Sequence, residues 1–226
     1  MSKLFIVGTP IGNLGDITYR AIETFKTVDF IAAEDTRHTL QLLTHFEIRK
    51  PLISCRAQNE SIVALRIIKE MDSGKNGAYA SDAGTPGVSD PGAVLAKMVR
   101  DAGHDVIPIP GASAFASLVS IAGPGGKTIC FAGFLSPKQG RRRSKLRELL
   151  ELDAAIILYE SPFRIVKLLT DVADIDCERR VVVGRELTKL HEEIVDGTAE
   201  QVRDIFAERQ KILGEFAIFI SATKNA

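Results

Sequence analysis

Short apolar runs alternate with amphipathic runs along most of this chain. Apolar runs at residues 4–7, 30–33, 52–53, 78–80 and 106–109 have the length of buried strands. Between them, apolar residues recur at helical spacing over residues 17–28, 36–46, 61–71, 93–102 and 113–121. This βαβα alternation predicts a mostly parallel sheet with helices on both faces.

The pattern is interrupted by Gly123-Pro124-Gly125-Gly126, which we interpret as a linker. We therefore expect two α/β domains, residues 1–122 and 123–226. In the second, we predict strands at 128–132, 155–159, 180–184, 193–196 and 216–220, and helices at 142–152, 163–172 and 199–208. Residues 192–197 alternate between apolar and polar, which indicates antiparallel pairing in a mixed sheet.

Composition narrows the function classes only a little. The 226 residues are 45% hydrophobic and 26% charged, with a formal net charge of +0, so no global charge attracts nucleic acid or membrane. Cys55, Cys130 and Cys177 are odd in number and unpaired in spacing, which argues for a reducing compartment and against a zinc site. His38 and His45 match no metal-ligand spacing, so no metal is expected. We see no signal peptide or transmembrane-length run and expect a cytoplasmic protein.

The loop at residues 81–92 is the strongest functional signal. It carries three glycines, two prolines and two aspartates between a predicted strand and a predicted helix. Ligands of open α/β sheets bind where such loops leave the strands, and a plain connection needs only about 2–6 residues. We expect Asp90 to be the N-cap of the next helix with Pro91 at its first position, which leaves Asp82 as the loop's better catalytic candidate.

Other predicted strands also end in loops that could carry chemistry. Residues 8–16 are glycine-rich but have neither the G-x-G-x-x-G nor the P-loop spacing, so a nucleotide-phosphate site is not supported. Residues 110–114, 159–162 and 185–189 place small or polar groups at strand ends. Glu34 and Asp35 are adjacent and cannot share a face, so we expect a helix cap at Asp35 or Thr36 rather than a paired acid–base site.

A basic run forms the one local charge patch. Its members are Lys138, Arg141, Arg142, Arg143, Lys145 and Arg147. In a chain of zero net charge the run favours a surface for RNA or another polyanion, the alternative being a solvated helix face. We find no interleaved aromatic residues that would support base stacking.

Taken in order, these motifs resemble those of a known family. They are Thr9-Pro10-Ile11-Gly12-Asn13-Leu14, Asp16-Ile17-Thr18, Ala33-Glu34-Asp35-Thr36-Arg37, residues 81–92, residues 108–114, Gly133-Phe134-Leu135, Tyr159-Glu160-Ser161-Pro162, residues 185–189 and Gly214-Glu215-Phe216. The chain is similar to the tetrapyrrole methylase-like, class III S-adenosylmethionine-dependent methyltransferases, and among them to the small-subunit ribosomal RNA methyltransferase I family.

The resemblance implies two α/β domains with S-adenosylmethionine in a cleft between them, and a homodimer. It implies methyl transfer to the ribose 2′-hydroxyl of a cytidine in the decoding region of 16S ribosomal RNA, on naked RNA or the small ribosomal subunit. By analogy with the wider fold family, eight residues contact the cofactor: Pro10, Thr85, Val88, Ser113, Ala114, Tyr159, Phe216 and Ala217.

This chain departs from the family in two places. Relatives often carry histidines in the segment Ser54-Cys55-Arg56-Ala57-Gln58-Asn59-Glu60, which has none here. Many also continue well past the last strand, so we expect RNA contacts from the basic run or from the partner subunit.

A ribose hydroxyl needs a general base to withdraw its proton. Candidates by their place at strand ends are Asp82, Asp90, Glu160, Glu186 and Lys189. Two alternatives stay open: a methyltransferase of the same fold acting on a tetrapyrrole or a protein side chain, and a non-catalytic RNA- or ribosome-binding module.

Overall fold

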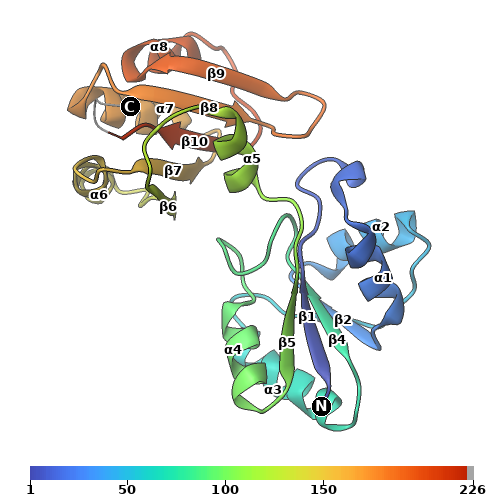
Figure 1. The fold of residues 1–226 in the computed structure, drawn as a ribbon. Coiled ribbons are helices and arrows are strands. Elements are labelled where there is room, and N and C mark those ends of the chain that lie inside the picture. Colours follow the sequence, from blue (N-terminus) through green and yellow to red (C-terminus); the bar gives the residue numbers. More distant parts are fainter. Residues whose placement is uncertain (223–226) are drawn as a thin grey trace. The chain divides into compact units, whose positions relative to one another are not determined.

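The computed structural model describes residues 1–222 of the chain. The chain divides into two compact units, Met1–Ser113 and a second unit that begins at Ala114 (Figure 1). The linker expected at residues 123–126 lies beyond this division. Helix α5 (Ala114–Ile121) precedes that linker and packs on strand β10 (Phe216–Ile220), so it is part of the second unit.

The first unit is an open parallel sheet with alternating helices, as the hydrophobic pattern predicted. The strand order is β3-β2-β4-β1-β5, and every pairing is parallel. Its elements are β1 (Lys3–Val7), η1 (Leu14–Asp16), α1 (Tyr19–Thr27), β2 (Phe30–Ala33), α2 (Thr36–His45), β3 (Leu52–Ser54), α3 (Glu60–Asp72), β4 (Gly77–Ala80), α4 (Ala93–Asp101) and β5 (Asp105–Ile109).

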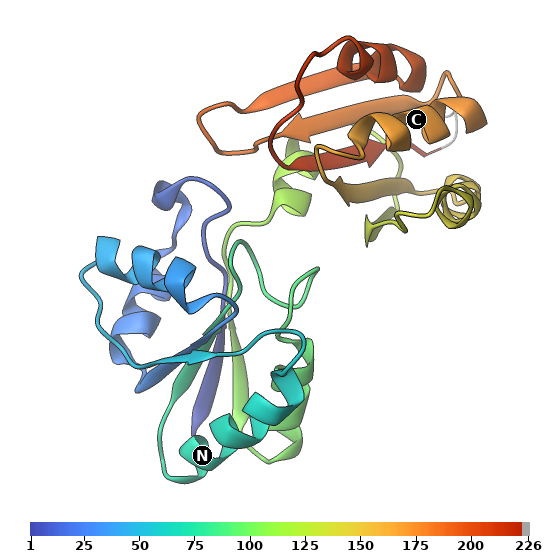
Figure 2. The ribbon, with the colours of Figure 1, turned by 180° about the vertical axis from the view of Figure 1, so that it is seen from behind.

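Helices cover both faces of this sheet (Figures 1 and 2). Leu4 and Tyr79 pack with side chains of α3 and α4 on one face, while Val7 and Ala78 pack with α1 and α2 on the other. The chain leaves β1 toward β2 and leaves β4 toward β5, so these two neighbouring strands connect in opposite directions. The carboxyl ends of such a strand pair are where open α/β sheets bind ligands.

The second unit is built on a mixed sheet with strand order β6-β7-β10-β8-β9. Strands β6 and β7 are parallel and the other pairings are antiparallel, which confirms the mixed sheet and the antiparallel pairing of residues 193–196. Its further elements are β6 (Ile129–Phe134), α6 (Gln139–Leu150), β7 (Ala155–Glu160), α7 (Ile165–Ile175), β8 (Arg180–Arg185), β9 (Glu193–Thr198) and α8 (Ala199–Ala207).

Helices α6, α7 and α8 cover one face of this sheet, where the largest apolar core of the chain lies. Helix α5 lies against the opposite face: a Cβ added at Gly184 would stand 3.1 Å from Leu118 Cδ1. Strand β6 carries a bulge between Phe131 and Gly133, so that Phe134 pairs with Tyr159. Gly133 has a φ of 61°, a left-handed conformation that glycine adopts easily. Within residues 1–222, every helix is too short or too polar to cross a lipid bilayer.

The start of α4 differs from the sequence prediction. The helix begins at Ala93 with Gly92 as its N-cap, so Asp90 is not the cap and Pro91 is not its first residue. The buried Glu60 of α3 supplies the missing acceptor: its Oε1 accepts hydrogen bonds from the amides of Gly92 at 2.8 Å and Leu95 at 2.9 Å. A carboxylate at a helix N-terminus also complements the helix dipole.

Because Glu60 satisfies two buried amides, we expect Glu60→Ala to lower the free energy of unfolding by about 1–3 kcal/mol. Urea denaturation followed by circular dichroism measures this loss. Glu60→Gln keeps an acceptor oxygen and serves as the matched control, with a smaller loss. Equal stability of wild type and Glu60→Ala would show that water replaces the carboxylate without cost.

Candidate active site

Three loops of the first unit are joined at the carboxyl ends of β1, β4 and β5. Thr9 and Gly84 form an antiparallel bridge with N···O distances of 2.9 and 3.1 Å. The Thr85 hydroxyl donates to the Ala112 carbonyl at 3.2 Å. Gly8 lies so close to Gly111 that a Cβ on Gly8 would stand 2.8 Å from the Gly111 Cα. The predicted cofactor residues Pro10, Thr85 and Ser113 therefore belong to one edge of this unit.

Two carboxylates flank this edge at the ends of β2 and β4. Asp82 Oδ1 accepts a hydrogen bond from the Asp35 amide at 2.9 Å, and the Asp82 amide lies 3.4 Å from Glu34 Oε2. Burial raises the pKa of Glu34, and the negative charges of Asp82 and Asp90 raise it further. Glu34 thus holds a proton more readily than an ordinary glutamate, an acid–base property that the sequence analysis did not assign to it.

Asp35 has the structural role that was expected of it. It is the N-cap of α2, with its carboxylate accepting from the Arg37 amide, and it pairs with the Arg37 guanidinium at 2.6 Å. Hydrogen bonds from that side chain and amide hold the pKa of Asp35 well below its usual range. Asp35 therefore stays charged and is a poor candidate for a proton acceptor.

In the second unit, the predicted residues Tyr159, Glu160, Phe216 and Ala217 lie on the neighbouring strands β7 and β10. Tyr159 pairs with Ala217 on the sheet face away from α6–α8, and its hydroxyl accepts from the Phe115 amide at 2.9 Å. The Phe216 side chain lies in the core, 5.6 Å from the Phe206 ring, so only its backbone can contact a ligand.

Glu160 lies on the helix-covered face and is buried. Its Oε1 accepts from the Ser161 amide at 2.7 Å and pairs with the Arg164 guanidinium at 2.6 Å. Its Oε2 is buried and has no hydrogen-bond partner among residues 1–222. The side chain thus fastens the turn before α7 to the end of β7.

Glu186 and Lys189 form a cluster with Glu215. Lys189 Nζ lies 2.9 Å from Glu186 Oε1 and 2.9 Å from Glu215 Oε2. Partial burial disfavours both charges, but the hydrogen bonds within the cluster outweigh it, so the pKa of Lys189 is raised and that of Glu186 is lowered. Lys189 is therefore protonated at neutral pH and cannot accept a proton. Glu186 and Thr188 have φ values of 52° and 67°, a strained turn of the kind that clusters at functional sites.

The basic run is less exposed than its composition indicated. Arg142 is only 3% exposed, and its Nε lies 2.6 Å from Asp171 Oδ2, so its assignment to an RNA-binding surface is wrong. Arg143 pairs with Asp174 at 2.9 Å and Lys145 with Glu148 at 2.9 Å. Lys138 and Arg141 are exposed, and their charged groups have no hydrogen-bond or ion-pair partner in the described part of the chain.

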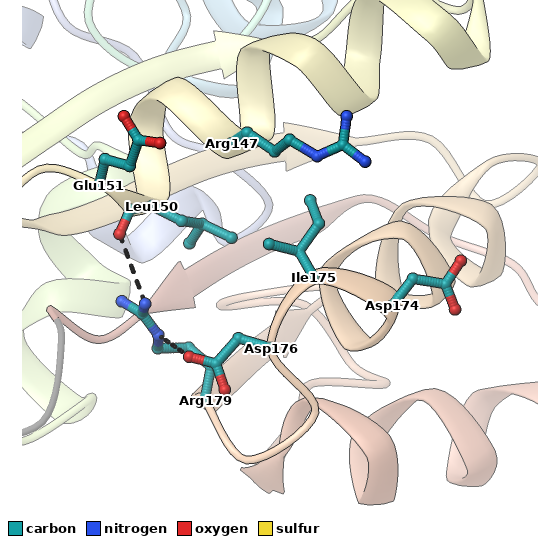
Figure 3. A pocket seen from close by; sticks show the side chains of 7 residues that line it. All are labelled: Arg147, Leu150, Glu151, Asp174, Ile175, Asp176 and Arg179. Atoms are coloured by element: carbon teal, nitrogen blue, oxygen red, sulfur yellow. Dashed lines mark hydrogen bonds and ion pairs between the residues drawn. The ribbon is translucent and has the colours of Figure 1, made fainter.

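A separate cavity of about 460 Å³ lies at the carboxyl ends of α6 and α7 (Figure 3). The residues lining it are Arg147, Leu150, Glu151, Asp174, Ile175, Asp176 and Arg179. Arg179 pairs with Asp176 at 2.9 Å and donates to the Leu150 carbonyl. Apart from Arg147 of the basic run, no predicted site residue lines this cavity. Among the described residues, no group of three His, Cys, Asp or Glu could hold a metal ion.

The sequence of this chain matches a known protein family. Residues 3–203 match the tetrapyrrole (corrin/porphyrin) methylases. The chain belongs to the tetrapyrrole methylase family. The resemblance drawn from the ordered motifs is thereby confirmed.

Curated relatives extend this match over nearly the whole chain. A protein of Borrelia garinii named ribosomal RNA small subunit methyltransferase I is 41% identical over 223 residues, which cover 98% of this chain and 100% of the relative. Proteins with the same name from Thermotoga maritima and Synechocystis are 42% and 45% identical over 98% of this chain, and the matches cover 99% and 79% of those proteins.

Solved structures share the fold of this tetrapyrrole methylase family member at low sequence identity. A diphthine synthase superposes with a TM-score of 0.72 at 14% identity, covering 100% of this chain and 92% of that one. The uroporphyrin-III-C-methyltransferase of Thermus thermophilus gives a TM-score of 0.66 at 16% identity, covering 97% and 94% of the two chains. The predicted α/β fold of two sheets, one parallel and one mixed, is confirmed.

Proposed function

We propose that this chain is an S-adenosylmethionine-dependent methyltransferase that acts on the ribose 2′-hydroxyl of a cytidine in the decoding region of 16S ribosomal RNA. The observation that carries the proposal is the near full-length identity of 41–45% to proteins named ribosomal RNA small subunit methyltransferase I. We further propose that it works as a homodimer in the cytoplasm, where its ribosomal substrate is.

The edge of the first unit fits S-adenosylmethionine. The close approach of Gly8 and Gly111 leaves an edge built of backbone and small side chains, which suits a ligand recognised through amide and carbonyl groups. Glu34 and Asp82 bring negative charge that favours a cationic sulfonium. We propose that Pro10, Thr85, Val88 and Ser113 hold the cofactor from this unit, and Ala114, Tyr159, Ala217 and the Phe216 backbone from the second.

The chemistry divides between cofactor and protein. When bound, S-adenosylmethionine supplies a methyl group that is already activated. The protein then has to orient the ribose and withdraw its 2′-hydroxyl proton. We assign the proton acceptor to Asp82, with Glu34 beside it as a group that can share or receive the proton. Lys189 is a cation that can contact an RNA phosphate, and Glu186 orients it.

A methyl-label assay tests this function directly. Labelled S-adenosylmethionine is incubated with the protein and either naked 16S RNA, 30S subunits or a tetrapyrrole. We expect label in RNA, and we expect the labelled position to resist alkaline cleavage because a 2′-O-methyl group blocks attack by the ribose hydroxyl. Label in the tetrapyrrole alone would show that the substrate is not RNA. Calorimetry without S-adenosylmethionine binding would favour a non-catalytic RNA-binding module.

A further inference from the structure

Two exposed aromatic side chains stand at the carboxyl ends of the neighbouring parallel strands β6 and β7. Phe134 ends β6 and is 57% exposed, and Phe163 lies in the turn after β7 and is 84% exposed. We propose that these two rings form a stacking platform for unpaired bases of the RNA substrate. This inference rests on the proposed function and adds to it the part of the surface that holds the bases.

The Phe134 ring is held in place although it faces solvent. Phe134 lies opposite Tyr159 on the neighbouring strand. The two ring centroids are 5.8 Å apart, and the ring planes make an angle of 65°. Tyr159 in turn lies 5.0 Å from Phe131, which lies 5.4 Å from Phe115. A chain of edge-to-face contacts therefore orders Phe134 from one side and leaves its other side open. A ring ordered in advance loses little conformational entropy when a base stacks on it.

The loops that carry the two rings are fastened to each other. Arg164 pairs with Glu160 at 2.6 Å and donates from Nη1 to the Leu135 carbonyl at 3.4 Å. The residue after Phe134 is thus bound to the residue after Phe163. Phe163 is four residues beyond Tyr159, so at most about 14 Å of chain separates their Cα atoms. The two rings are therefore carried by loops that lie beside each other in the second unit.

Free cations flank both rings. Lys138 and Arg141 follow Phe134 in the sequence. Lys167 follows Phe163 and lies in the first turn of α7. All three are exposed, and their charged groups have no hydrogen-bond or ion-pair partner among residues 1–222. Aromatic rings beside unpaired cations are the composition with which proteins bind single-stranded nucleic acid, the rings stacking on bases and the cations meeting phosphates.

The charge argues against a second copy of this chain as the occupant. In a symmetric dimer contact the same patch meets itself, so the free cations of the two copies would face one another. A polyanion has the complementary charge. The sequence alone does not reveal this surface, because the two phenylalanines are far apart in the chain and only the pairing of β6 with β7 brings the ends of these strands together.

Binding measurements with alanine variants test the platform. The probe is a fluorescent RNA fragment spanning the decoding region, titrated with wild type, Phe134→Ala, Phe163→Ala and the double variant. We expect each single variant to bind about 5- to 150-fold more weakly. Phe134→Trp keeps a stacking face and is expected to retain affinity. Ile62→Ala removes an exposed side chain of α3 and is the matched control, with affinity unchanged.

Salt dependence separates stacking from phosphate contact. We expect the slope of log affinity against log salt to stay the same in the phenylalanine variants and to flatten in Lys138→Ala and Arg141→Ala. Unchanged RNA affinity in both phenylalanine variants overturns the platform. So does an equal loss of S-adenosylmethionine affinity, which would make the rings cofactor contacts, or a change of oligomeric state, which would make them a subunit interface.

The test distinguishes this inference from the proposed function because it requires no methyl transfer. Wild-type protein that binds the RNA through both rings but never methylates it would leave the platform standing and overturn the proposed function. Wild-type protein that methylates RNA while both alanine variants bind it with full affinity would do the opposite.

Discussion

Asp82→Asn is expected to lower the rate of methyl transfer by about 10²- to 10⁴-fold, the usual contribution of a general base. Asparagine has nearly the same shape as aspartate and cannot accept the ribose proton. Its side-chain oxygen can still accept the hydrogen bond that Asp82 receives from the Asp35 amide, so the ends of β2 and β4 stay joined. Single-turnover transfer to 30S subunits measures the chemical step.

The controls for Asp82→Asn separate chemistry from binding. The thermal midpoint is expected to stay near wild type, and S-adenosylmethionine affinity is expected to fall far less than the rate, because Asp82 supplies only part of the negative charge near the sulfonium. Glu34→Gln provides a second isosteric change in the same pair. Since the Asp82 charge raises the pKa of Glu34, Asp82→Asn should also lower that pKa and move the acidic limb of any remaining activity to lower pH. A rate within about threefold of wild type would remove Asp82 from the catalytic role.

Asp171→Ala is expected to lower the free energy of unfolding by about 3–5 kcal/mol. Asp171 is 1% exposed and receives the Arg142 guanidinium at 2.6 Å, with Gln139 at 3.4 Å. Removing the carboxylate leaves a buried cation without its partner between α6 and α7. Urea denaturation at neutral pH measures the change, and the midpoint should fall without a change in slope.

Two comparison variants define what the Asp171 result means. Glu148→Ala breaks an exposed pair with Lys145 on the same helix and should cost at most about 1 kcal/mol. The double variant Arg142→Met with Asp171→Leu removes both charges and should recover most of the lost stability, because apolar side chains can replace a buried pair. A loss below about 1 kcal/mol in Asp171→Ala would show that water reaches Arg142 and compensates its charge.

Most helices and strands could be predicted because the positions that each of them buries are apolar. The strand at Phe30–Ala33 is uniformly apolar and is buried along its whole length, and the alternating segment that begins at Glu193 pairs antiparallel. The boundary between the two units could not be predicted in the same way: it was expected after residue 122 and lies after Ser113. Glycines mark a break in regular structure, but only packing shows that α5 lies on the sheet of the second unit.

The site residues show why sequence patterns alone are not sufficient. The basic run predicted a charged face, but Asp171 lies 29 residues after Arg142 in the sequence, and only the packing of α7 on α6 reveals the pair. In the same way, Asp90 had the residue type and position of an N-cap, whereas it is Glu60 of a neighbouring helix that accepts the hydrogen bond from the Gly92 amide. Such long-range partners carry no local signal.

The bulge in β6 has a consequence for how this surface could change in evolution. Successive side chains of a strand point to opposite faces, so the same residues paired without the bulge would place Phe134 opposite Glu160, on the helix-covered face. Deletion of Ala132 would instead remove the bulge and leave Gly133 opposite Leu158 and Phe134 opposite Tyr159, so the ring would stay on the open face. The pairing register of this strand, and not only its composition, determines whether the second unit presents an aromatic ring on its open face.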